Sequence, residues 1–212
     1  MNLHKYGASV PPTGKGKRVR GLHVAVASIS LAAFLITGCG GSNQSKRTAV
    51  IETDLGSIKI ELLEDESPKT VENFRLLAER GYYDGTIFHR VVSGFMIQGG
   101  DPKGNGSGGE TATGAPLPNE IDPRSPLYQG GYKRGIVAMA NKGKPETGSS
   151  QFFIMHGDRS SSQLPLNYTI FGRVTEGMDV VDRIAAAPTT NAPNGEKSRP
   201  VTPVKTNRIY LQ

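Results

Sequence analysis

Two stretches of the 212-residue chain combine side chains in patterns that could do chemistry. The first is the glycine tract Gly104–Gly109, which matches G-x-G-x-x-G, the spacing that brings a phosphate to a helix N-terminus. Here the tract runs into Glu110–Gly114 and then into Pro116 and Pro118, which do not open such a helix. The sequence therefore favours a flexible surface loop over a nucleotide site.

The second stretch, Phe88–Asp101, places one guanidinium, that of Arg90, close to Phe95 and Met96. This combination could form an apolar pocket with a charged hydrogen-bond donor at its edge. Each residue also has an ordinary explanation. Periodicity alone favours core positions for Phe95, Met96 and the more distant Phe153, and an isolated arginine is most often a solvated surface charge.

Cysteine and histidine usage excludes two other kinds of site. The single Cys permits no internal disulfide, and with only four His it leaves no zinc-type cluster. His89 and His156 have no neighbouring residues that would complete a triad or a metal site, so we interpret both as structural. No cofactor or metal is expected.

The second stretch and two later segments together resemble the signature segments of cyclophilins, the peptidyl-prolyl cis–trans isomerases. They are Phe88–Asp101, Gly135–Asn141 with Gly148–Ile154, and Phe171–Val174 with Gly177–Val181. The resemblance covers Ala49 to Gln212. It implies an enzyme that acts on X-Pro bonds, with proline-containing peptides and unfolded secreted proteins as partners, and a monomer.

The chemistry of this reaction suits these residue types. Proline isomerisation is rotation about a partial double bond with a barrier of about 18–20 kcal/mol, and no bond is broken. It needs an apolar slot for the ring and a donor that favours the twisted amide over either planar ground state. The resemblance implies that Arg90 is this donor, and that Gln98 and Gln151 orient it and the substrate carbonyl.

The resemblance also assigns the remaining site residues. Phe95, Met96 and Phe153 would form the proline slot, with Leu164 closing one side, and the backbone of Asn141 would pair with the peptide. The expected catalytic residues are Arg90 and Gln98; the expected substrate-binding residues are Phe95, Met96, Ala140, Asn141, Gln151, Phe153, Leu164 and Tyr168.

Three positions depart from the best-known form of the family. The loop Arg159–Asn167 contains no Trp, and Gln163 or a neighbour stands in that place. In the family this Trp serves cyclosporin binding more than turnover, so the resemblance implies weaker inhibition of this protein by cyclosporin. Tyr168 stands where many members have His, and Lys142 replaces a small residue beside the substrate backbone.

Alternation and turn residues predict the elements that position these side chains. Strands are expected at residues 49–53, 57–62, 87–92, 95–98, 136–139, 152–155, 170–174 and 207–211. A helix should begin at Ser67-Pro68 and end at Arg80-Gly81, and a second should span Met178 to Ala185. The predicted fold is mostly β: a closed eight-stranded antiparallel barrel capped by two helices, cyclophilin-like.

The N-terminal residues resemble a bacterial lipoprotein leader. A basic stretch up to Arg20 precedes an apolar run from Leu22 to Ile36, shorter than the roughly 20 residues that span a bilayer. The sequence Ile36-Thr37-Gly38-Cys39 follows, and it contains the only Cys of the protein. We predict a signal peptide (1–38), acylated Cys39 with a polar tether (39–48), and an isomerase domain (49–212). A plain signal peptide or an uncleaved anchor helix with an incidental Cys remains the alternative.

Charge and localisation follow from this division. Residues 1–38 hold five Lys or Arg and no acid, whereas the remaining 174 residues hold 20 basic and 19 acidic residues. The near-neutral body gives no reason to expect nucleic-acid binding. The expected location is the bacterial cell membrane, with the protein lipid-anchored (palmitate) and facing the extracytoplasmic side.

Two other functions are weighed against the isomerase. A non-catalytic peptide-binding or chaperone module would keep the groove and lose the rate, and the presence of Arg90 argues against it. A solute-binding lipoprotein would need a larger, two-lobed chain than these 174 residues provide.

Overall fold

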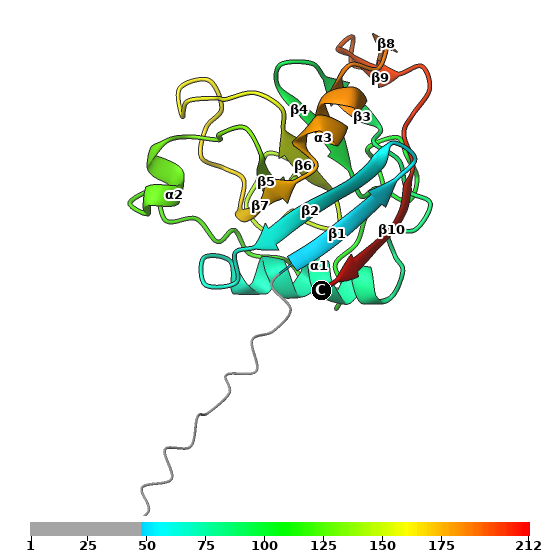
Figure 1. Cartoon of the computed structure of the whole chain (residues 1–212). Coiled ribbons are helices and arrows are strands. Elements are labelled where there is room, and N and C mark those ends of the chain that lie inside the picture. The colour runs from blue at the N-terminus through cyan, green and yellow to red at the C-terminus, as the bar shows by residue number, and fades with distance from the viewer. Residues whose placement is uncertain (1–47) are drawn as a thin grey trace, which may run out of the picture. The chain divides into compact units, whose positions relative to one another are not determined.

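A computed structural model describes residues 48–212, in which eight strands form one antiparallel sheet (Figure 1). Their order across the sheet is β10-β1-β2-β7-β5-β6-β4-β3. The strands are β1 (Thr48–Thr53), β2 (Gly56–Leu62), β3 (Arg90–Val92), β4 (Met96–Gly99), β5 (Ile136–Met139), β6 (Phe152–Met155), β7 (Ile170–Glu176) and β10 (Thr206–Leu211). The mostly-β, antiparallel prediction is confirmed, and each of the eight expected strands is found.

The edge strands β10 and β3 approach each other without forming a ladder. Ile87, just before β3, makes an isolated bridge to Lys205, just before β10. The Phe88 N–H donates to the Val204 carbonyl at 3.0 Å, and the Thr206 N–H donates to that of Thr86 at 2.8 Å. Among the described strands, the predicted full closure of the barrel by a β10–β3 ladder is not found. Only these short links join the two edge strands. The strand predicted at 87–92 is shorter in the structure, because only residues 90–92 pair in a ladder.

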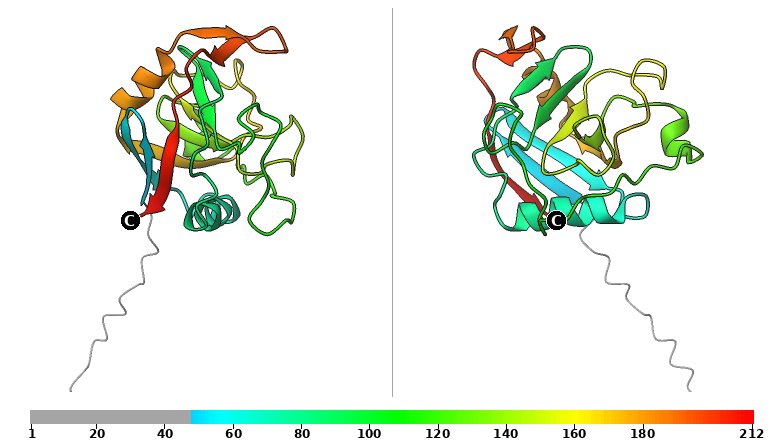
Figure 2. Two further views of the ribbon diagram at one scale, coloured as in Figure 1. Left: turned by 90° about the vertical axis from the view of Figure 1, so that its right-hand side faces the viewer. Right: turned by 180° about the vertical axis from the view of Figure 1, so that it is seen from behind.

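A two-stranded hairpin after the last helix was not predicted. It consists of β8 (Thr189–Asn191) and β9 (Lys197–Pro200), which pair only with each other. The hairpin lies beyond the β3 end of the sheet, at the opposite end of the molecule from α1 (Figures 1 and 2). Its sequence is polar and proline-containing, so it lacks the apolar alternation by which a strand is recognised.

Helix α1 (Pro68–Glu79) begins after Ser67, as predicted, but another residue caps it. The Ser67 hydroxyl donates to the Leu63 carbonyl at 3.3 Å and makes no cap bond. Instead the Glu120 carboxylate accepts the N–H groups of Lys69 (3.0 Å) and Thr70 (2.8 Å). A distant acid thus satisfies donors that a helix start leaves unpaired, and its charge suits the helix dipole.

The apolar faces of the helices pack as the periodicity predicts. Val71, Phe74, Leu77 and Ala78 of α1 are buried, and so are Val181 and Ile184 of α3 (Met178–Ala185). A third, four-residue helix, α2 (Pro126–Gln129), was not predicted. Within residues 48–212, none of these helices has the length and apolar character needed to cross a bilayer.

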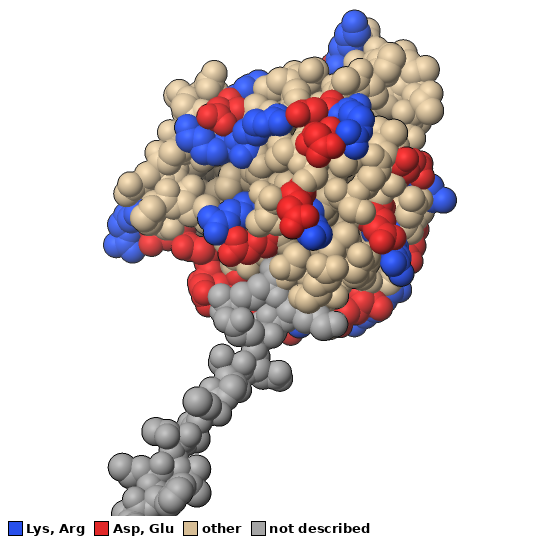
Figure 3. Space-filling model, in the orientation of Figure 1, with Lys and Arg blue, Asp and Glu red and all other residues tan. Residues whose placement is uncertain are grey.

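The sheet separates two apolar clusters, because successive side chains of a strand point to opposite faces. One face packs against α1 and α3 and includes Ile97 and Ile154. The other includes Met96, Phe153 and Met155 with two buried tyrosines from the 117–135 segment. On the outside, basic and acidic side chains are interspersed over the face shown in Figure 3.

The glycine tract is a loop, as predicted, and hydrogen bonds hold it in place. The buried Asp101 carboxylate accepts backbone N–H groups from Lys103 (2.9 Å), Asn105 (3.1 Å) and Gly106 (2.7 Å). A Cβ at Gly108 would overlap this carboxylate, so the close approach requires glycine there. Burial raises the pKa of Asp101, but these backbone donors outweigh it and the net pKa lies below the ordinary value.

Asp101→Asn should destabilise the protein by about 1–3 kcal/mol. The amide NH2 group would face backbone N–H groups in a buried site and could not accept their hydrogen bonds. For the native protein, the lowered pKa means that this stabilisation is present at neutral pH and is lost as the pH falls below about 4. Urea unfolding at pH 7 measures the first effect. The exposed Asp179→Asn is the control and should change stability by less than about 1 kcal/mol; equal losses in both variants would contradict the argument.

Candidate functional site

A row of four side chains crosses the second face of the sheet, and the strand register brings it together. Arg90 of β3 lies opposite Gln98 of β4, Gln98 lies opposite Phe153 of β6, and Phe153 lies opposite Ala138 of β5. The residues between them on the same strands, such as Ile97, point into the other cluster. The alternation of β3 and β4 therefore places a guanidinium and an amide beside a phenyl ring.

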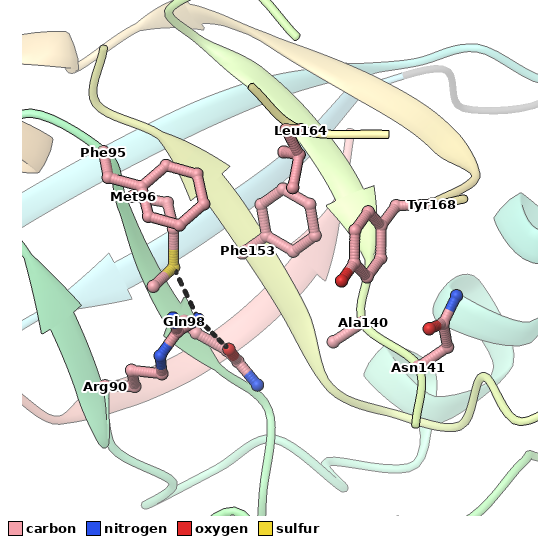
Figure 4. A pocket seen from close by; sticks show the side chains of 9 residues that line it. All are labelled: Arg90, Phe95, Met96, Gln98, Ala140, Asn141, Phe153, Leu164 and Tyr168. Carbon is pink, nitrogen blue, oxygen red and sulfur yellow. Dashed lines mark hydrogen bonds between the residues drawn. The ribbon is translucent and has the colours of Figure 1, made fainter. Parts of the chain in front are cut away.

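Three residues of this row, Arg90, Gln98 and Phe153, line a cavity of about 250 Å³ (Figure 4). The lining residues are Arg90, Phe95, Met96, Gln98, Ala140, Asn141, Phe153, Leu164 and Tyr168. Figure 4 shows Arg90 and Gln98 at one side, Asn141 at the far side, and aromatic rings between them. The structure thus brings together nine of the ten site residues that the sequence predicts in the described chain.

The tenth, Gln151, is not among the residues that line this cavity. Its Oε1 accepts from the Gln98 Nε2 at 2.9 Å, and its own Nε2 donates to the carbonyls of Gly106 (3.1 Å) and Gly108 (2.8 Å). The contact with Gln98 is compatible with the orienting role expected of Gln151, and Gln151 lines a neighbouring hollow together with Gln98, Ala140 and Asn141. Its expected contact with the substrate stays a prediction. Its amide is used up in joining Gln98 to the glycine loop, which fixes the direction of the Gln98 side chain.

A buried tyrosine that the sequence did not reveal supports the aromatic wall. Phe153 and Tyr168 pack edge to face, with ring centroids 5.3 Å apart. Behind them the Tyr132 hydroxyl donates to the Tyr168 carbonyl at 3.0 Å and accepts the Tyr168 N–H at 2.9 Å. Burial raises the pKa of Tyr132 well above its ordinary value, so the hydroxyl stays protonated. Tyr132 follows two glycines outside any periodic run, so no local signal marks it.

The turn that presents Phe95 is held by a histidine. Gly94 adopts a φ of +72°, and its N–H donates to the His156 Nδ1 at 2.8 Å. The other ring nitrogen of His156 lies 3.1 Å from Asp182 on α3. This geometry fits the structural role expected of His156. His89 also lies outside the cavity lining, and burial lowers its pKa.

The loop that carries no Trp turns Gln163 away from the cavity. Gln163 is exposed, and its Oε1 accepts from the N–H (3.1 Å) and the hydroxyl (3.2 Å) of Ser160. The next residue, Leu164, lines the cavity. Position 163 therefore contributes neither an aromatic face nor an amide group to the cavity.

The guanidinium of Arg90 is held from two sides. Nη1 donates to the Gln98 Oε1 at 3.3 Å and lies 3.7 Å from the Met96 sulfur (Figure 4). Nε and Nη2 donate to the two carboxylate oxygens of Glu196, at 2.6 and 2.7 Å. These hydrogen bonds from Arg90 lower the pKa of Glu196 below the ordinary value, against a smaller opposing effect of burial. Glu196 lies 106 residues further along the chain, in the polar hairpin, and the sequence did not reveal it.

The arrangement can bind an apolar ring and donate hydrogen bonds from one cation. Arg90 is the single charged side chain among the lining residues; the others are apolar, aromatic or amide. A carbonyl or amide nitrogen next to a bound ring would face a donor in a partly desolvated site, where hydrogen bonds to charged groups are strongest.

The predicted lipidation site Cys39, like all residues before Thr48, lies outside the described residues.

Comparisons with known proteins agree on one family. A family model described as cyclophilin type peptidyl-prolyl cis-trans isomerase matches residues 48–210. A peptidyl-prolyl cis-trans isomerase of Arabidopsis thaliana is 45% identical over 166 residues, which cover 77% of this chain and 95% of the relative. The human peptidyl-prolyl cis-trans isomerase-like 3 is 40% identical over 164 residues, with coverages of 77% and 95%.

Solved structures give the same result. The crystal structure of a Cryptosporidium parvum cyclophilin type peptidyl-prolyl cis-trans isomerase, in the presence of the dipeptide Ala-Pro, is similar with a TM-score of 0.69 and 35% sequence identity. The match covers 78% of this chain and 98% of that one.

Proposed function

Because the chain belongs to the cyclophilin-type peptidyl-prolyl cis–trans isomerases, we propose that its cavity binds the proline of an X-Pro segment and that Arg90 is the catalytic donor. The activity itself is that of its family. The observation that carries the assignment of residues is the row Arg90–Gln98–Phe153, which sets a fixed guanidinium beside an apolar slot.

In the proposed mechanism, the proline ring sits between Phe95, Met96 and Phe153, and the peptide bond before it lies next to Arg90. As the bond twists, the nitrogen loses conjugation and becomes pyramidal, and a hydrogen bond from the guanidinium to that nitrogen becomes stronger. The donor thereby favours the twisted state over both planar ones and lowers the barrier in both directions. Gln98 holds Nη1 and is in turn held by Gln151.

The structure of the Cryptosporidium parvum cyclophilin with Ala-Pro supports a proline-containing peptide as the substrate class here as well. The cavity continues to Asn141, whose side-chain amide is tied to the Asn167 carbonyl at 2.7 Å. We propose that the Asn141 backbone pairs with the residues before the proline, and that Ala140 leaves room for them.

A protease-coupled assay on an X-Pro tetrapeptide tests the function. Residues 42–212 should accelerate the cis-to-trans step, which takes tens to hundreds of seconds without a catalyst. A non-catalytic peptide-binding module would instead bind the tetrapeptide, measured by titration, and leave the isomerisation rate unchanged. That result would refute the isomerase assignment and favour the alternative.

We propose further that the enzyme is a lipid-anchored, extracytoplasmic protein of a bacterial membrane, attached through acylated Cys39. What supports this is the leader described above, with the only Cys of the chain directly after Ile36-Thr37-Gly38. Multiple acyl chains on one residue anchor a protein stably, where a single chain does not. Unfolded secreted proteins would then be its clients.

Cys39→Ser should abolish incorporation of labelled palmitate and leave the protein either unprocessed or released from the membrane fraction. The reason is that the thiol is the only acceptor for the thioether-linked lipid. Ser42→Ala, three residues away in the tether, is the control and should be labelled normally. A Cys39→Ser protein that still carries label and is cleaved like the native chain would show the lipoprotein hypothesis to be wrong.

A further inference from the structure

The carboxylate of Glu196, on the β8–β9 hairpin, binds one edge of the Arg90 guanidinium, the proposed catalytic donor. Glu196 accepts from the Nε and Nη2 of Arg90 at 2.6 and 2.7 Å, one bond to each carboxylate oxygen. Each of the two side chains is 33% exposed. This is the two-point arginine–carboxylate geometry that fixes both the position and the plane of a guanidinium.

The hairpin is built to hold Glu196 at that place. The Ala192 N–H donates to the Glu196 carbonyl at 2.8 Å, and the Glu196 N–H donates to the Asn194 side chain at 3.1 Å. Pro193 and Gly195 complete the turn, and Gly195 has a φ of +84° that favours glycine. The hairpin packs against β3, the strand that carries Arg90 (Figures 1 and 2). Its strands therefore place the carboxylate on the side of Arg90 opposite to β4.

A count of the donors shows which end of Arg90 stays at the cavity. A guanidinium has five N–H groups. Glu196 takes the N–H of Nε and one of Nη2, while Nη1 faces Gln98 and the Met96 sulfur. The carboxylate therefore uses the edge away from the cavity. The Nη1 end stays beside two lining residues, and sulfur is a weak acceptor that a substrate amide can replace.

We propose that Glu196 is a positioning residue for the isomerase reaction: it holds the Nε–Nη2 edge of Arg90 so that the Nη1 end faces the proline slot. The inference rests on the proposed role of Arg90. An arginine side chain on a surface strand samples many rotamers. If the guanidinium had to be ordered during the reaction, the reaction would be slower than with the guanidinium already in place. The expected benefit appears in the transition state rather than in substrate binding.

The opposite role, in which Glu196 withdraws Arg90 from the substrate, makes the reverse prediction. A withdrawing carboxylate would compete for the cavity-facing donors, and its removal would raise the rate. The observed bonds leave Nη1 in contact with Gln98 and Met96, so the geometry favours positioning.

The test compares Glu196→Gln and Glu196→Asp with the native full-length chain, using kcat and KM for an X-Pro tetrapeptide. Glu196→Gln should lower kcat/KM roughly 5- to 20-fold, mainly through kcat, because the neutral amide offers one acceptor where the carboxylate offers two. Glu196→Asp keeps the charge and should recover part of the loss. Glu52→Gln is the matched control: it weakens the two-point pair of Glu52 with Arg208 (2.9 and 3.3 Å) between β1 and β10, and should leave both constants unchanged.

A second experiment follows the Arg90–Glu196 contact itself and does not depend on enzyme activity. In ¹⁵N NMR spectra, the Arg90 Nε–H should exchange slowly with water in the native protein and rapidly in Glu196→Gln, with Arg90→Lys assigning the signal. An active native enzyme with equal or faster turnover in Glu196→Gln would overturn this inference alone. So would a native Nε–H that already exchanges rapidly. A native protein with no turnover would refute the proposed function, and this inference with it.

Discussion

Arg90→Ala is expected to lower kcat/KM about 100- to 1000-fold while the protein stays folded. The guanidinium is the single charged donor among the cavity residues, and in the proposed mechanism it acts chiefly on the twisted amide. Each factor of ten corresponds to about 1.4 kcal/mol, so the loss of one charged transition-state hydrogen bond accounts for two to three such factors. The protease-coupled assay measures the rate, and circular dichroism with urea unfolding verifies the fold.

Two variants make this result specific. Arg208→Ala removes a guanidinium of the same kind, paired with Glu52 away from the cavity, and should turn over like the native protein. Arg90→Lys keeps the charge but loses the planar fork that spans Gln98 and Glu196, so most of the rate should be lost. Near-native turnover of Arg90→Ala would refute the assignment of the donor.

Cyclosporin is expected to inhibit this enzyme at least one to two orders of magnitude more weakly than cyclophilins that carry the loop Trp. The chain contains no Trp, and Gln163, the residue before the cavity-lining Leu164, folds back onto Ser160. At about 25 cal/mol per Å², losing 60–100 Å² of apolar contact costs roughly 1.5–2.5 kcal/mol, before any hydrogen bond from an indole is counted. Turnover should not suffer, because the proposed proline slot consists of the cavity residues Phe95, Met96 and Phe153.

Gln163→Trp should restore part of the inhibitor affinity, measured as the inhibition constant in the same assay. Ser161→Trp, in the same exposed loop, is the control and should restore none. Tight inhibition of the native protein would show that another side chain supplies the missing contact.

Much of the fold can be predicted because its signals are local. The strands at 136–139 and 152–155 and the helix at 178–185 coincide with the predicted bounds. The two strands are short continuous apolar runs that are buried throughout, and the apolar side chains of the helix recur at helical spacing. Arg90 and Gln98 are predicted by the family resemblance, and the structure adds that they lie opposite each other on adjacent strands.

What the prediction missed depends on residues far apart in the chain. The N-terminus of α1 shows the helical signal of Ser67-Pro68, yet its cap is Glu120, which only the fold brings there. The β8–β9 hairpin is polar, so neither its strands nor Glu196 stand out from a surface loop.

The sequence by itself therefore determined the fold class and the family resemblance, and through that resemblance it named nine residues that line one cavity. The tertiary structure decided how these residues are held: Gln151 behind Gln98, Tyr132 behind Tyr168, and Glu196 on the far edge of Arg90. The physical reason is that periodicity and turn preferences depend on residues that are close together in the sequence. A hydrogen bond from a polar side chain to a partner 36 to 106 residues away leaves no such pattern, because only the tertiary fold brings the two groups together.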